Sequence, residues 1–173
     1  LFFPAPYVFS IWTVIYLGLA VYVVYQVLPA QRANTRLQAI APWFVLNTTL
    51  NSAWMFAWHY NAVLLSTILM AGILTTLIII YRKCGIGVFP VERKEKLAVR
   101  LPFRIYLGWI SVATIANVSV WLYTINVHIF SLKDETATAI MIVVAGLLAS
   151  LMLMRFRDMI FSAVIVWSLL GIM

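Results

Sequence analysis

The sequence predicts an all-α membrane protein, a polytopic bundle of about six transmembrane helices. Of its 173 residues, 65% are hydrophobic and only 10% are charged, whereas soluble domains have about 45–50% apolar and about 25% charged residues. A soluble fold of this size would still need a polar surface. The hydrophobic residues also gather in runs of about 20, the length that crosses a hydrocarbon core of roughly 30 Å. Lipid is therefore the expected environment of the chain.

Prolines and charged residues mark the limits of the predicted spans. Pro29 follows the first span, and Pro42 and Pro102 lie in the opening turns of the second and fourth spans, where a missing N–H is tolerated. We find no internal repeat in the sequence. The six predicted spans are residues 7–28, 38–59, 62–81, 102–124, 136–154 and 159–173.

The basic residues predict the orientation of the bundle. The loops of residues 29–37, 82–101 and 155–158, with the residues beside them, hold eleven of the twelve Lys and Arg. Six alternating spans place these three loops on one side, and an excess of Lys and Arg marks the cytoplasmic side. We therefore expect these loops in the cytoplasm and residues 1–6 on the outer side.

The net charge of +7 does not indicate a nucleic-acid partner. The most basic segment, VERKEKLAVR at residues 91–100, alternates in sign and has no interleaved aromatic residues. Such a segment is typical of a solvated loop near anionic headgroups. The lipid bilayer is the partner that the charge pattern predicts.

The spans have few groups that carry chemistry. No Asp, Glu, Lys or His lies near the middle of a predicted span, which argues against a proton-coupled or ion-coupled pump. No catalytic constellation is found, so we expect no catalytic residues, no metal site and no required cofactor. The single Cys84 permits no internal disulfide. His59 and His128 lie near the predicted outer surface, where interfacial histidines are a simpler interpretation than a pair of ligands.

Aromatic and amide side chains share faces on three spans. A spacing of three or four residues puts side chains on one side of a helix, and an asparagine facing lipid would leave its amide without a partner. These faces are therefore expected to point into the bundle, although Trp residues also form interfacial belts and Asn residues also join helices. The faces comprise Trp12 and Tyr16; Trp43, Asn47, Asn51, Trp54 and Trp58; and Tyr106, Trp109, Ala113, Asn117 and Trp121.

Depth along the helices brings some of these groups to one level. At 1.5 Å per residue, Trp12, Asn51, Trp54 and Asn117 are expected one to two turns below the outer surface. A cavity between them would suit a flat and largely apolar ligand with polar edges.

Three segments of the chain resemble the tryptophan-rich sensory proteins, which are relatives of the TspO/translocator-protein family. The segments are YVFSIWTVIYLGL, LNTTLNSAWMFAWHY and LPFRIYLGWISVATIANV, and the similarity extends over roughly residues 4–123. The resemblance implies a four-helix TspO-like portion at residues 1–124. Residues 125–173 are then additional transmembrane helices of the same membrane domain.

The resemblance also implies a function. Family members bind tetrapyrroles such as protoporphyrin and haem, and animal members bind sterols. We therefore expect a binding and sensory protein whose ligand is porphyrin-like or another flat hydrophobic molecule. The expected ligand-binding residues are Trp12, Tyr16, Asn47, Asn51, Trp54, Trp109, Ala113 and Asn117. The resemblance implies six of them as lining residues, whereas Tyr16, which also matches the family pattern, and Asn47 are added from the shared faces.

Other functions stay open at this point. Some relatives are reported to degrade porphyrin under light, so a weak catalytic role is one of them. Small residues four apart in the fifth span, such as Gly146 and Ser150, would suit close helix contact. The chain would then be a homodimer or a structural subunit of a larger membrane complex. An uncoupled carrier of small amphipathic molecules is a third alternative.

Overall fold

The computed structural model describes residues 6–125 and 134–171, and the regular elements in these ranges are all helical. The predicted all-α bundle is therefore confirmed. The long helices are α1 (Ile11–Val27), α2 (Thr35–His59), α3 (Val63–Lys83), α5 (Leu101–Thr124), α6 (Asp134–Phe156) and α7 (Met159–Leu170). Short turns complete the elements: η1 (Pro6–Ser10), η2 (Pro29–Gln31), α4 (Arg93–Glu95) and η3 (Lys96–Arg100).

Within the described ranges, four helical segments are long and apolar enough to cross a membrane: Pro6–Val27, Val63–Lys83, Arg93–Thr124 and Ala139–Phe156. With 25 residues, α2 has the length of a span, but its Asn, Ser and Thr residues make it more polar. The 12 residues of α7 extend about 18 Å at 1.5 Å per residue, which is less than the thickness of the hydrocarbon core.

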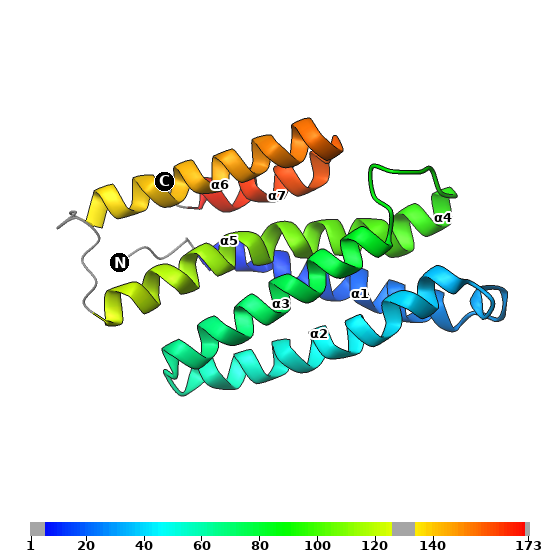
Figure 1. The fold of residues 1–173 in the computed structure, drawn as a ribbon, viewed down its shortest axis with the longest axis horizontal. Helices are drawn as coiled ribbons and strands as arrows, with labels where there is room; N and C mark the ends of the chain where they lie inside the picture. Colours follow the sequence, from blue (N-terminus) through cyan, green and yellow to red (C-terminus); the bar gives the residue numbers. More distant parts are fainter. Residues whose placement is uncertain (1–5, 126–133, 172–173) are drawn as a thin grey trace.

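The helices surround α5, which runs through the middle of the bundle (Figure 1). On one side, α3 packs against α5 and α2 packs against α3. On the other side, α7 packs against α5, and α6 forms a hairpin with α7. The additional C-terminal helices are therefore packed onto α5 rather than forming a separate body. The domain boundary predicted at 124/125 borders residues 126–133, which lie outside the described ranges.

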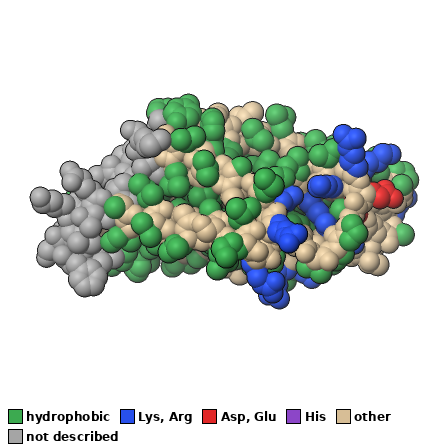
Figure 2. All heavy atoms as spheres, turned by 90° about the horizontal axis from the view of Figure 1, so that it is seen from above, with side chains coloured by type: hydrophobic (Ala, Val, Ile, Leu, Met, Phe, Trp, Pro, Cys, Tyr) green, Lys and Arg blue, Asp and Glu red, His purple; other side chains and the backbone are tan. Residues whose placement is uncertain are grey.

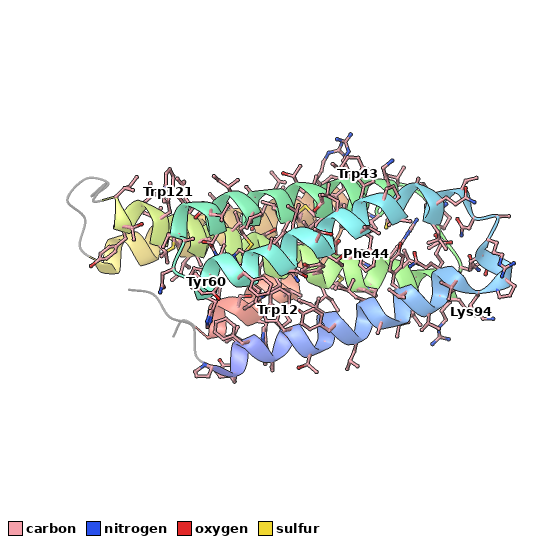
Figure 3. All side chains as sticks on the ribbon, turned by 90° about the horizontal axis from the view of Figure 1, so that it is seen from below. Trp12, Trp43, Phe44, Tyr60, Lys94 and Trp121 are labelled. Atoms are coloured by element: carbon pink, nitrogen blue, oxygen red, sulfur yellow. The ribbon has the colours of Figure 1, made fainter. Side chains whose placement is uncertain are left out.

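Large aromatic side chains fill the space between α1 and α2. Cα atoms of the two helices scarcely come within 8 Å of each other. Tyr22 of α1 meets Phe44 of α2 at a centroid distance of 5.0 Å, and Phe103 of α5 lies 4.9 Å from Tyr22. Figure 3 shows Trp12 and Phe44 in this space. The aromatic residues therefore determine how α1 docks on the bundle.

The basic side chains gather at one end of the molecule (Figure 2). Arg36 at the start of α2 pairs with Glu95 of α4. At the same end, Tyr81 near the end of α3 donates a hydrogen bond to Asp158, which precedes α7. The three predicted basic loops therefore lie together, as alternating spans require. Lys133, His128 and residues 1–5 lie outside the described ranges.

Candidate functional site

Trp12 and four other aromatic rings, which together come from three helices, form a cluster. The ring centroid of Trp12 lies 5.4 Å from that of Tyr16, 6.5 Å from that of Trp54, 5.9 Å from that of Tyr106 and 6.2 Å from that of Trp109. We call this group the aromatic cluster: Trp12, Tyr16, Trp54, Tyr106 and Trp109.

Helical periodicity explains how the chain builds the cluster. Tyr16 lies one turn after Trp12 in α1, and their rings stack with an interplanar angle of 22°. Tyr106 and Trp109 are three residues apart in α5, so both rings reach the same side of that helix. Trp54 comes from α2 and completes the cluster. Four of the expected ligand-binding residues are therefore brought together, and Tyr106 joins them.

The geometry of the rings differs between neighbours. The indoles of Trp12 and Trp54 are nearly parallel, with an angle of 27°, whereas those of Trp12 and Trp109 are nearly perpendicular, at 81°. Trp58 continues the series, because its ring stacks on Trp54 at 6.1 Å and 27°. Phe9 of η1 also contacts Trp109, at 5.8 Å. Neither Trp58 nor Phe9 is among the expected ligand-binding residues.

The cluster extends from the bundle interior to its surface. Tyr106 and Trp109 are buried, with 1% and 4% of their surface exposed. Trp12 and Trp54 are half-buried, and Tyr16 is 46% exposed. The cluster therefore borders the surface of the bundle at Tyr16.

Three polar atoms beside the rings are buried and have no hydrogen-bond partner among the described residues. They are Nε1 of Trp54, Nε1 of Trp109 and Oδ1 of Asn51. Asn51 lies one turn before Trp54 on α2, so its amide is on the same face. An unpaired polar group away from water is costly. The described residues therefore leave the hydrogen-bonding capacity of these three atoms unused.

Asn47 has a different surrounding from Asn51. Its side chain is fully buried, and its Nδ2 donates to the carbonyl oxygen of Ile73 at 3.1 Å and to Oγ1 of Thr76 at 2.8 Å. Both partners belong to α3. Asn47 therefore joins α2 to α3 and points to that interface rather than to Trp12.

Asn117 also contacts α3. Its Oδ1 accepts a hydrogen bond from Oγ of Ser66 at 3.1 Å, and its own Nδ2 donates to the carbonyl oxygen of Ala113 at 3.4 Å. Ala113 lies one turn after Trp109 and packs against the core. The structure thus places Asn117 two turns along α5 from Trp109, in a contact between α3 and α5.

The basic end contains buried charged groups that the sequence analysis did not single out. Asp158 is fully buried and Arg100 is 7% exposed. Sequence alone offered one signal: Asp158 stands directly before an apolar run, as an N-cap residue does. Its carboxylate indeed accepts the backbone N–H of Phe161 at 3.0 Å.

The comparisons with known proteins identify one family. The family model described as TSPO-like protein matches residues 1–173, which includes the two C-terminal helices as well as the segments quoted above. No curated protein and no solved structure matches the chain.

Proposed function

The chain belongs to the TSPO-like protein family, and from that membership we propose that it is an integral membrane binding and sensory protein. Its aromatic cluster would hold a flat, largely apolar ligand of the porphyrin type. The observation that carries the proposal is the convergence of Trp12, Trp54 and Trp109 from three helices. A second support is the unpaired polar atoms beside these rings.

The ring geometry supports stacking as the mode of binding. Trp12 and Trp54 present nearly parallel faces, and their centroids are 6.5 Å apart. A ring held between two others needs two contacts of about 3.5 Å each, or about 7 Å in total. A small outward shift of α1, whose backbone makes little contact with α2, would admit such a ligand.

The polar atoms support a ligand with polar groups at its edge. The indole N–H groups of Trp54 and Trp109 can donate, and the Asn51 oxygen can accept. A porphyrin has propionate oxygens at its edge and N–H groups at its centre. The aromatic cluster contains no His, Cys or Met, and only Tyr16 and Tyr106 are of a type that can ligate haem iron. We propose that stacking rather than axial coordination would hold haem. We therefore expect haem, which has no N–H groups to donate to Asn51, to bind severalfold more weakly than metal-free protoporphyrin.

A titration of the purified protein with protoporphyrin tests the proposal. The Soret absorption band reports binding without depending on the number of tryptophans that remain. Trp54→Ala is expected to weaken binding about tenfold, since a stacked aromatic pair is worth about 0.5–1.5 kcal/mol beyond its buried area. Asn51→Ala is expected to weaken it severalfold through one lost hydrogen bond.

Two matched variants serve as controls for this titration. Trp43→Ala removes a tryptophan from the same helix, eleven residues or about 16 Å from Trp54, and Ser52→Ala alters an exposed neighbour of Asn51. Both are expected to bind as the wild type does. Identical titration curves for Trp54→Ala, Asn51→Ala and the wild type would exclude the aromatic cluster as the site.

We also propose that the basic end faces the cytoplasm. Eleven of the twelve Lys and Arg lie in or beside the three loops at this end, and such an excess marks the cytoplasmic side. Single cysteines placed at Arg32 and at Tyr60, in a Cys84→Ser background, would report the sidedness. A membrane-impermeant maleimide added to intact cells should label the cysteine at position 60 and not the one at position 32.

A structural subunit of a larger membrane complex is the second candidate function. It is favoured by α6, where a Cβ added at Gly146 would meet nothing within 4 Å and Ser150 is exposed. This open surface of small residues suits another helix. Gly146→Leu would then dissociate a complex that co-purifies with the chain, while protoporphyrin binding would not change.

A further inference from the structure

Three of the arginines at the basic end are buried or half-buried, and two of these three have a carboxylate partner. Arg36 pairs with Glu95, and Arg104 lies 2.7 Å from a carboxylate oxygen of Asp158. Arg100 has no carboxylate partner within the described ranges. The guanidinium of Arg100 is therefore buried without an ion pair of its own, although the charge of Glu95, which is paired with Arg36, also acts on it.

The surroundings of Arg100 leave part of its hydrogen-bonding capacity unused. Nη1 donates to the carbonyl oxygen of Phe89 at 2.8 Å. Nε and Nη2 are buried and have no partner among the residues that the structure describes, although only 7% of the residue is exposed. A buried charge without a counter-charge is costly. The site lacks an anionic acceptor on the side of Nε and Nη2.

The segment that carries Arg100 is a π-helical turn, η3, which leads directly into α5. Turns of this kind often mark functional sites, because they displace side chains from regular helical positions. Here the turn ends at the residue whose guanidinium is unpaired. The π-helical turn therefore ends at the residue whose Nε and Nη2 atoms have no hydrogen-bond partner.

The loop of residues 84–92 covers this region. The ring of Phe89 lies close to two guanidinium groups, with its centroid 4.6 Å from that of Arg36 and 5.0 Å from that of Arg100. Gly85 has a φ of +61°, and a Cβ at this position would collide with the Phe89 ring. The loop therefore rests on Arg36 and Arg100 through one aromatic side chain.

We propose that Arg100, with Arg36 beside it, binds a phosphate group beneath the Phe89 loop. The planar guanidinium presents Nε and Nη2 as a pair of parallel donors, which matches two oxygens of a phosphate. The phosphate belongs either to an anionic phospholipid or to a soluble molecule. Arg100 is 24 residues from Thr124, or about 36 Å along the helix, so it lies at headgroup level when α5 crosses the hydrocarbon core.

The alkylation rate of Cys84 in the wild-type protein tests this site. Cys84 is fully buried and stands at the start of the loop, so N-ethylmaleimide reaches it only when the loop opens. The protein is kept in neutral maltoside micelles and given either inorganic phosphate or phosphatidic acid. A ligand that holds the loop closed is expected to slow alkylation about tenfold at ten times its Kd.

The two probes distinguish the sources of the phosphate. Slowing by phosphatidic acid alone assigns the site to a lipid headgroup, and slowing by inorganic phosphate assigns it to a soluble molecule. Potassium chloride at equal ionic strength is the control for screening. If neither probe slows alkylation, or if chloride slows it equally, the proposal is overturned.

A pair of variants localises the effect. Arg100→Gln is expected to lose the protection, whereas Arg93→Gln, which removes an equal charge at an exposed position in α4, is expected to keep it. Equal protection in Arg100→Gln and the wild type would overturn the assignment. Should Arg100→Gln fail to fold, Arg100→Lys retains the charge without the paired donors, and a severalfold weaker protection is expected.

Discussion

Arg104 and Asp158 form a buried ion pair that joins α5 to the start of α7. Nη2 of Arg104 lies 2.7 Å from Oδ1 of Asp158, and Nε donates to the same oxygen at 2.8 Å. The other carboxylate oxygen accepts a hydrogen bond from Tyr81 of α3 at 2.7 Å. One carboxylate therefore connects three helices at the basic end, 54 residues away in sequence from its arginine.

We predict that Asp158→Ala lowers the free energy of unfolding by about 3–5 kcal/mol, because removing one member of a buried pair leaves the other charge uncompensated. Thermal and denaturant unfolding in micelles would measure the loss. Glu92→Ala, which removes an exposed carboxylate, is the control and should change little. The double variant Arg104→Met/Asp158→Ala should recover part of the stability, since no unpaired charge remains.

The hydrogen bonds of Asn47 predict a structural role for that residue. Asn47→Ala should lower the free energy of unfolding by about 0.5–2 kcal/mol, the range of interhelical hydrogen bonds in membrane proteins, and should leave protoporphyrin affinity unchanged. Asn51→Ala should do the opposite, with weaker binding and little loss of stability. If Asn47→Ala weakened binding severalfold without destabilising the protein, Asn47 would have to be counted among the ligand-binding residues.

Local pattern was sufficient to predict the helices. The span predicted at residues 38–59 corresponds to α2 at Thr35–His59, and the span predicted at residues 102–124 corresponds to α5 at Leu101–Thr124. Length and hydrophobicity determine a membrane helix almost alone, because the backbone must satisfy its own hydrogen bonds in lipid. Differences of a few residues at the ends reflect fraying and caps such as Asn34, which hydrogen-bonds the first turn of α2.

Spacing was less informative about the direction in which each face points. Asn47, Asn51 and Trp54 share one broad face of α2, yet Asn47 contacts α3 and Trp54 contacts α1. A face wider than one neighbouring helix divides between two partners, and only the packing decides which residue meets which partner. The ion pair of Arg104 and Asp158 could not be predicted from the sequence for a related reason. It joins two segments that are far apart in the chain, and no periodic pattern links them.

The burial of the Cys84 thiol predicts how its alkylation and the stability of the protein depend on pH. Burial raises the pKa of this thiol from 9.0 to about 12, although the charges of Arg100 and Arg36 oppose the shift. At pH 8 the thiolate fraction of the folded protein should therefore be about a thousandfold smaller than in the unfolded chain, since each pKa unit is a factor of ten. We therefore expect Cys84 to be alkylated slowly in the folded protein in micelles and rapidly after unfolding.

The raised pKa of Cys84 also predicts the direction in which the free energy of unfolding changes with pH. The folded protein holds the thiol proton more tightly than the unfolded chain does, so this contribution is complete below pH 9 and is lost as the pH rises from 9 to about 12. Cys84→Ser should show a shallower loss in this window, because serine does not titrate there. Parallel pH profiles for Cys84→Ser and the wild type would contradict the prediction.

The contact of α5 with α7 depends on Gly108. A Cβ at this position would lie 3.0 Å from Cβ of Val164 and 3.1 Å from the carbonyl oxygen of Phe161. Alanine has a higher helix propensity than glycine by about 1 kcal/mol, whereas overpacking of a tight contact costs about 1–3 kcal/mol. The cost of overpacking should prevail, because a backbone carbonyl cannot move aside as a flexible side chain can.

We therefore predict that Gly108→Ala destabilises the protein by up to about 2 kcal/mol, the difference between these two opposing effects. Gly146→Ala is the matched control, since its added methyl group would meet nothing within 4 Å, and it should stabilise α6 by up to about 1 kcal/mol. Unfolding of both variants in the same micelles measures the contrast. Equal stabilisation by the two substitutions would mean that α7 does not pack against α5 as closely as these distances require.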